Sequence, residues 1–103
     1  MKAIVVRRGE KPVVEEVGEE LEAMQAVVGG YIQEIMPWED EVALVCNEEG
    51  KLNGWPINRF LLDEKGRVVD AICGTFFLCY APMDSETFLS MPEHLIDKYM
   101  RIF

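Results

Sequence analysis

The alternation of apolar and polar positions predicts strands over most of the first half of the chain. Residues 2–7 are apolar and β-branched on both alternating faces, which is typical of an interior strand. After a turn containing Gly9 and Pro12, residues 13–17 indicate a short returning strand. Residues 31–35 and 41–46 each keep one apolar face on either side of the turn 37–40, so they predict a hairpin.

The second half combines a long irregular stretch with further strands. Residues 47–59 hold two Gly, one Pro and three Asn, so we expect no regular element there. We expect Leu52, Trp55 and Ile57 to hold this loop on the core. Residues 60–62 and 67–72 predict a strand pair joined by the turn 63–66. Apolar character continues through 71–81 on both faces, so this strand should be covered on both sides, by helices or by a second chain.

Two segments have helical spacing. In residues 19–28 the apolar positions recur every three or four residues, and Gly29 follows as a stop signal. Near the end of the chain, Ser90 and Glu93 have the spacing of a capping box, with Ser90 as the N-cap and Pro92 in the first turn. The apolar stripe that follows comprises Leu95, Ile96, Tyr99, Met100 and Phe103. We expect this stripe to pack on a sheet.

These elements predict the fold class α+β: a mostly antiparallel sheet of four to six strands with two helices packed on it. The 103 residues suit one hydrophobic core, so we expect a single domain over residues 1–103. No apolar run approaches about 18 residues, so no membrane-spanning helix is expected. Residues 1–12 lack the pattern of a secretory signal. Three cysteines without a CxxC pattern read as buried thiols in the reducing cytoplasm.

Charge narrows the classes of partner. The chain has a formal charge of −9, and residues 15–49 hold eleven acidic residues and no Lys or Arg. A polyanionic segment repels phosphate backbones, which argues against nucleic-acid binding. The same segment is compatible with a basic partner, with a solvated face, or with a protein that mimics DNA by presenting Glu15, Glu16, Glu19, Glu20 and Glu22 in place of phosphates.

The central block resembles a known family. Residues 45–54, VCNEEGKLNG, followed by Pro56 and the pair Asn58-Arg59, are similar to the signature of an uncharacterised bacterial and phage family, the domain-of-unknown-function family 3846. The opening residues 1–12, the segments 29–32 and 74–77, and the final helix fit the same pattern. This resemblance implies a single compact domain and a setting in phages or mobile elements. It implies no activity, ligand or catalytic residue.

The loop is the candidate binding site. Its candidate residues for a ligand or partner are Asn47, Glu48, Glu49, Lys51, Asn53, Trp55, Asn58 and Arg59. Lys and Arg can bind an anion, and Asn side chains offer both donors and acceptors. The alternative is structural: Asn and Gly satisfy turn geometry, while Lys51 and Arg59 pair with Glu48 or Glu49 at the surface.

No pattern points to catalysis. His94 is the only histidine, no cysteine lies near it in sequence, and neither metal-ligand nor cofactor motifs occur. We therefore expect no catalytic residue, metal or cofactor, and a binding or accessory protein that contacts an unknown protein partner through residues 47–59. A homodimer stays open. The alternatives are an acidic DNA-mimic or anti-restriction protein, and a small-molecule binder or enzyme that uses the same loop.

Overall fold

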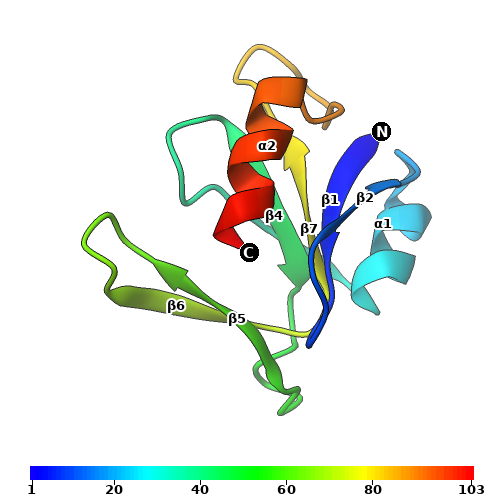
Figure 1. Cartoon of the computed structure of the whole chain (residues 1–103). Coiled ribbons are helices and arrows are strands. Elements are labelled where there is room, and N and C mark those ends of the chain that lie inside the picture. Colours follow the sequence, from blue (N-terminus) through cyan, green and yellow to red (C-terminus); the bar gives the residue numbers. More distant parts are fainter.

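The computed structural model describes the whole chain, residues 1–103, as seven strands and two helices (Figure 1). In chain order they are β1 (Lys2–Val6), β2 (Val13–Glu16), α1 (Leu21–Val28), β3 (Ile32–Ile35), β4 (Val42–Asn47), β5 (Ile57–Leu62), β6 (Val68–Cys73), β7 (Phe76–Tyr80) and α2 (Glu93–Ile102). The predicted α+β class is confirmed. Five strands form one antiparallel sheet, and β5 with β6 forms a separate two-stranded hairpin.

The main sheet has the order β2-β1-β7-β4-β3, so β7 joins two pairs of strands that the chain makes first. Leu78 on β7 lies opposite Ile4 on β1 and opposite Leu44 on β4. The predicted pairs, β1 with β2 and β3 with β4, are both confirmed as antiparallel. Neither helix is long and apolar enough to cross a lipid bilayer.

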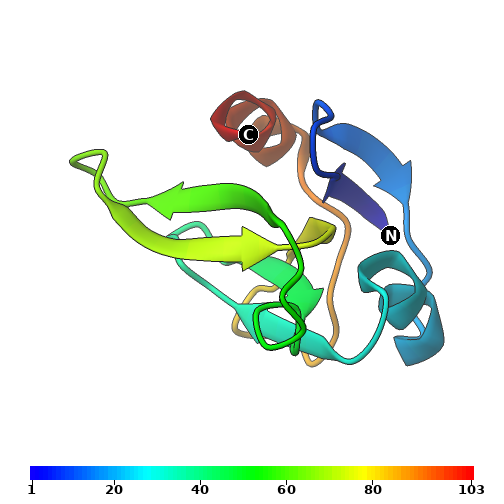
Figure 2. The ribbon, with the colours of Figure 1, turned by 90° about the horizontal axis from the view of Figure 1, so that it is seen from below.

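The three central strands supply two cores because successive side chains of a strand point to opposite faces. On one face Ile4, Leu44 and Leu78 pack beneath α2 and the hairpin, and on the other Val5, Val45 and Phe77 pack beneath α1. Figures 1 and 2 show α1 and α2 on opposite sides of the sheet. The expectation that the last strand is covered on both faces is met by elements of the same chain.

The predicted continuous strand over residues 71–81 is wrong, because the chain breaks at Gly74 and Thr75. Gly74 has a left-handed conformation (φ 84°), and its N–H donates to the Pro56 carbonyl oxygen at 3.2 Å. The residues before the break belong to β6, in the hairpin, and those after it belong to β7, in the main sheet. The sequence does not reveal this change of sheet, because the residues on both sides of the break are apolar.

Helix α1 begins two residues later than predicted and ends where predicted. Gly29 adopts the left-handed conformation (φ 81°), and its N–H donates to the Gln25 carbonyl oxygen at 2.8 Å. Met24 and Val28 are the buried side chains that dock the helix on the sheet. Only one apolar side chain per turn of this short helix is buried, and its one acidic residue, Glu22, is exposed to solvent.

Helix α2 docks its predicted apolar stripe on the opposite face, with Leu95, Ile96 and Tyr99 buried. The predicted N-cap is wrong: the helix begins at Glu93, with Pro92 at the cap position and no side-chain cap. The Ser90 hydroxyl instead accepts a hydrogen bond from the Lys2 N–H at 2.7 Å, and the Met91 N–H donates to the Lys2 carbonyl oxygen at 2.9 Å. Pairing with β1 holds Ser90 away from the helix.

The turn before β4 is attached to α2. Trp38 packs edge-on against Tyr99 and Phe103, with ring centroids 4.8 and 6.0 Å apart. The Tyr99 hydroxyl donates to Asp40 Oδ2 at 2.7 Å, and Lys98 forms an ion pair with the same carboxylate. The hydrogen bonds from Lys98 and from Tyr99 hold the pKa of Asp40 below its usual value, while burial raises the pKa of Tyr99.

The β5–β6 hairpin projects away from the sheet (green, Figure 1). The irregular stretch is shorter than predicted, because Asn47 ends β4 and residues 57–59 begin β5. At the hairpin turn, Asp63 Oδ1 accepts hydrogen bonds from the N–H groups of Lys65 and Arg67, both at 2.9 Å, and Gly66 adopts the left-handed conformation expected of a turn (φ 79°). Leu61 and Ile72 are the buried side chains that attach the hairpin to the core.

Candidate functional site

Residues 48–56 form an ordered loop between β4 and β5. The Glu48 N–H donates to the Tyr31 carbonyl oxygen at 2.8 Å, which ties the start of the loop to the strand beside it. Within the loop, the Asn53 N–H donates to the Glu49 carbonyl oxygen at 2.9 Å and the Trp55 N–H to the Gly50 carbonyl oxygen at 3.0 Å. These bonds give the loop one defined shape although it contains no helix or strand.

Trp55 fixes the end of the loop on the body of the protein. The indole is half-buried and lies over two glycines from different parts of the chain. A Cβ atom at Gly29 would stand 3.2 Å from Trp55 Cη2, and a Cβ atom at Gly74 would stand only 2.6 Å from Cε3. The absence of side chains at these two positions therefore makes room for the ring.

Asn47 supports the loop from below and has little surface left for a ligand. It is 8% exposed, and its Nδ2 donates to the carbonyl oxygen of Val28, the last residue of α1, at 3.2 Å. Its Oδ1 accepts a hydrogen bond from the Glu49 N–H at 2.7 Å. The side chain thus satisfies a carbonyl group that the helix end leaves unpaired.

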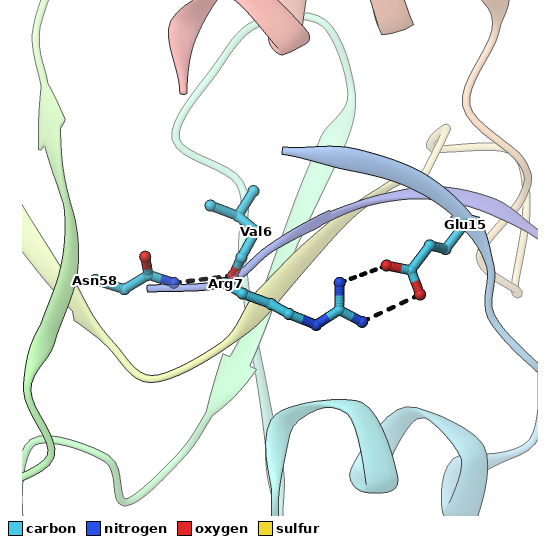
Figure 3. Close-up of polar contacts among 4 residues, drawn as sticks. All are labelled: Val6, Arg7, Glu15 and Asn58. Carbon is cyan, nitrogen blue, oxygen red and sulfur yellow. Dashed lines mark hydrogen bonds and ion pairs between the residues drawn. The ribbon is translucent and has the colours of Figure 1, made fainter. Parts of the chain in front are cut away.

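Asn58 and Arg59 connect the hairpin to the main sheet, and Figure 3 shows the bond from Asn58 to Val6. The buried Asn58 amide donates from Nδ2 to the carbonyl oxygens of Val6 and Gly74, both at 2.9 Å. Arg59 Nη1 donates to Asn58 Oδ1 at 2.8 Å, and Nη2 donates to the Glu10 carbonyl oxygen at 2.6 Å. The prediction that Arg59 pairs with Glu48 or Glu49 is wrong, since its guanidinium bonds to Asn58 and to a backbone carbonyl.

Lys51 pairs with Asp70 on β6, and not with Glu48 or Glu49 as the structural alternative supposed. The contact raises the pKa of Lys51 and lowers that of Asp70, with the mutual hydrogen bond as the main cause. Both side chains are substantially exposed, so the pair stabilises the fold by no more than about 1 kcal/mol. The two residues line a hollow of about 100 Å³, which is small beside the roughly 300–1,000 Å³ of ordinary ligand pockets.

The outward side of the loop is its tip, which we define as residues 51–54. All four tip residues are exposed, as are Glu48 and Glu49 before them. The prediction that Leu52 and Ile57 pin the loop on the core is wrong, because their side chains are 87% and 46% exposed. Trp55 alone supplies that anchor. The structure therefore separates the eight predicted residues into a buried or bonded base and an exposed side.

Two of the three cysteines, Cys46 and Cys73, line the same hollow as Lys51 and Asp70. Cys46 and Cys79 are buried, and burial raises the pKa of both thiols, to about 12 for Cys79. Cys73 is half-buried, and His94 is exposed on α2. No group of three or more His, Cys, Asp or Glu side chains is placed to hold a metal ion.

The acidic stretch is partly neutralised by the chain itself. Arg7 forms a two-pronged ion pair with Glu15, which Figure 3 shows beside Asn58, and this contact lowers the pKa of Glu15. The N-terminal ammonium group lies 3.3 Å from Glu16. Two of the five carboxylates proposed to mimic phosphates are therefore paired before any partner binds.

Sequence reasoning missed an apolar surface on the β5–β6 hairpin. Phe60, Leu62, Val68 and Val69 are each more than half exposed. The pattern held a signal: both strands are apolar on both alternating faces, yet a two-stranded hairpin can bury only one face on the body.

The whole chain, residues 1–103, matches the family model described as Domain of unknown function (DUF3846). No curated protein and no solved structure matches the chain. What this protein does must therefore be inferred from its own surface.

Proposed function

Since the chain belongs to the DUF3846 family, whose description assigns no activity, we propose a function from its own geometry. The protein is a non-catalytic binding or accessory protein that contacts another protein through the segment 47–59. The observation that carries this proposal is a loop fixed at both ends whose tip, residues 51–54, is exposed to solvent. The resemblance to a bacterial and phage family favours a partner from a phage, from a mobile element or from its host.

A fixed loop is suited to recognition because ordering it on binding costs little entropy. The base is held by three side chains: Asn47 bonds to the end of α1, Trp55 packs on the two glycines beneath it, and Asn58 bonds to β1. A flexible loop samples many conformations, and restricting it to one of them on binding costs conformational entropy. Here the fold has already selected one.

The chemistry of the tip suits a protein partner better than a small molecule. Leu52 offers an apolar side chain that is 87% exposed, and Asn53 offers both a donor and an acceptor. The adjacent hollow of about 100 Å³ is too small to enclose most metabolites. An exposed apolar side chain beside polar groups instead resembles the way loops contact the surface of another protein.

The test is quantitative capture from an extract of the native host with immobilised protein. The variant Leu52→Ser/Asn53→Ser changes the tip and leaves its anchors intact. The matched control, Met83→Ser/Asp84→Ser, removes an apolar and a polar side chain from another exposed turn. We expect the amount of a specific partner that is recovered to fall at least about tenfold with the tip variant and to be unchanged with the control.

Equal recovery by the tip variant and the control would refute the loop as the contact surface. The DNA-mimic alternative predicts a different result: capture would survive the tip variant but disappear after Glu19→Gln/Glu20→Gln/Glu22→Gln, and would weaken steeply with salt. One set of capture experiments therefore distinguishes the two proposed functions.

A further inference from the structure

Two cysteines from different parts of the fold meet at one hollow between the main sheet and the hairpin. Cys46 is next to the last residue of β4, in the main sheet, and Cys73 is the last residue of β6, in the hairpin. Both line the hollow of about 100 Å³ that also contains Lys51 and Asp70 in its wall. The third cysteine, Cys79, lies on β7 among the side chains that pack beneath α1, on the opposite face of the sheet.

The start of the loop keeps Cys73 close to the end of β4. The Gly50 N–H donates to the Asn47 carbonyl oxygen at 3.5 Å, which turns the chain back as it leaves the strand. A Cβ atom at Gly50 would stand 3.6 Å from Cys73 Cβ and 2.9 Å from the Cys73 carbonyl oxygen. Gly50 is only four residues after Cys46, so this contact brings the two cysteines to the same hollow although they are 27 residues apart in sequence.

The two thiols differ in how easily a reagent reaches them. Cys46 is 5% exposed, and burial is the main cause that raises its pKa. The Asp70 carboxylate and the Cys73 thiol raise this pKa further, while Lys51 lowers it, so the two cysteines are close enough to affect each other's ionisation. Cys73 is only half-buried, so a reagent in solvent reaches Cys73 before it reaches Cys46.

From this placement we propose that Cys46 and Cys73 form a reversible disulfide across the hollow when the protein meets a low-molecular-weight disulfide. The Cys73 thiolate attacks one sulfur of the reagent, forms a mixed disulfide with it and releases the other half as a thiolate. The Cys46 thiolate then attacks the Cys73 sulfur and releases the second half. The two protons of the protein thiols pass to the released thiolates, so the protein loses two electrons and the reagent gains them.

The bond joins the main sheet to the hairpin at the base of the loop. The other polar link at this hollow is the exposed ion pair between Lys51 and Asp70, which is a weak constraint. A disulfide that forms by exchange in a reducing compartment is transient and responds to the redox state. The cysteine pair is therefore a modification site whose oxidation fixes the hairpin on the sheet. This inference does not depend on the proposed role of the loop tip.

The test uses the folded full chain in mixtures of oxidised and reduced glutathione of increasing ratio. Free thiols are then trapped with an alkylating reagent after unfolding, and mass spectrometry counts the trapped thiols and any attached glutathione. We expect the wild type to lose two of its three free thiols and to retain no glutathione, with a peptide map that joins Cys46 to Cys73. The matched control, Cys79→Ala, should form the same bond.

The variant Cys46→Ala separates the two steps, because alanine keeps a small apolar side chain at the buried position and removes the thiol. It should stop at the mixed disulfide, with one glutathione on Cys73. Cys73→Ser should react with oxidised glutathione at least about tenfold more slowly than the wild type, because its remaining thiols are buried. Circular dichroism checks that each variant is folded, and Cys46→Val provides the same comparison if Cys46→Ala is unfolded.

Unfolding the wild type in urea shows whether the fold selects the pair. In the unfolded chain Cys73 should pair mainly with Cys79, because these cysteines are six residues apart and the shorter loop closes more readily. A folded protein that gives the same pairs as the urea sample would overturn the inference. So would a folded wild type that keeps three free thiols in excess oxidised glutathione, or one that stops with glutathione on Cys73.

Discussion

Replacing Asn58 with alanine removes the polar connection between the hairpin and the main sheet. The amide donates to two carbonyl oxygens, those of Val6 and Gly74, at 2.9 Å each. The amide is 9% exposed, and alanine supplies no replacement donor. Each stranded buried carbonyl costs about 1–2 kcal/mol, so the free energy of unfolding should fall by about 2–4 kcal/mol. Domains of this size are stable by only about 5–15 kcal/mol, so the loss is large.

Urea unfolding followed by circular dichroism measures this loss. With a typical dependence of about 1–3 kcal/mol per molar urea, the midpoint should shift down by about 1–3 M. The matched control is Asn53→Ala, which removes the same amide from the exposed tip, where its side chain makes no hydrogen bond within the chain. We expect that control to stay within about 0.5 kcal/mol of the wild type.

The result also decides how Asn58 should be regarded. If Asn58→Ala and Asn53→Ala were equally stable, the buried amide would not hold the hairpin and the interpretation of Figure 3 would be refuted. Asn58 would then again be a candidate residue for partner binding. If only Asn58→Ala is destabilised, any loss of binding in that variant has a structural cause.

Three further predictions concern glycine, carboxylate and thiol groups. Gly74→Ala should be less stable than Gly66→Ala by about 1–3 kcal/mol in urea unfolding, because both have positive φ but only the first meets the Trp55 ring. Because the pKa of Asp40 is lowered by folding, the ionised carboxylate stabilises the folded protein. This stabilisation is complete above the unfolded pKa, near 4, and is lost as the pH falls through the folded pKa. The free energy of unfolding of Asp40→Asn should therefore fall less between about pH 6 and pH 3 than that of the wild type. In native protein, Cys73 should react with a thiol reagent well before the two buried cysteines, and simultaneous reaction of all three would contradict the core described above.

The strands and helices were predictable where the spacing of apolar residues along a segment matched the faces that this segment buries. Residues 2–7 read as an interior strand because both faces are buried, by α1 on one side and α2 on the other. The stripe on α2 was equally clear because its polar partners are charged. Gly29 and Gly66 predicted the turns in which they lie, because a positive φ excludes most other residues.

The failures share a cause, which is that contacts between distant residues override local preference. Ser90 has a capping sequence, but a hydrogen bond to Lys2, 88 residues away, holds it elsewhere. Lys51 has acidic neighbours in the sequence, and it pairs with Asp70 across the loop. The role of Asn58 as a connector depends on Val6 and Gly74, which no local pattern brings together. Such pairings exist only after the chain has folded.

The central position of β7 has a consequence for how the protein is made in the cell. As residues leave the ribosome, β1 can pair with β2 and β3 with β4, but the two pairs have no common strand until residues 76–80 emerge. Until then, the apolar side chains of both pairs and those of the β5–β6 hairpin are exposed to other nascent chains. The sheet is therefore completed only after β7 has emerged, and chaperones that shield unfinished sheets should influence the yield of this protein more than its final stability.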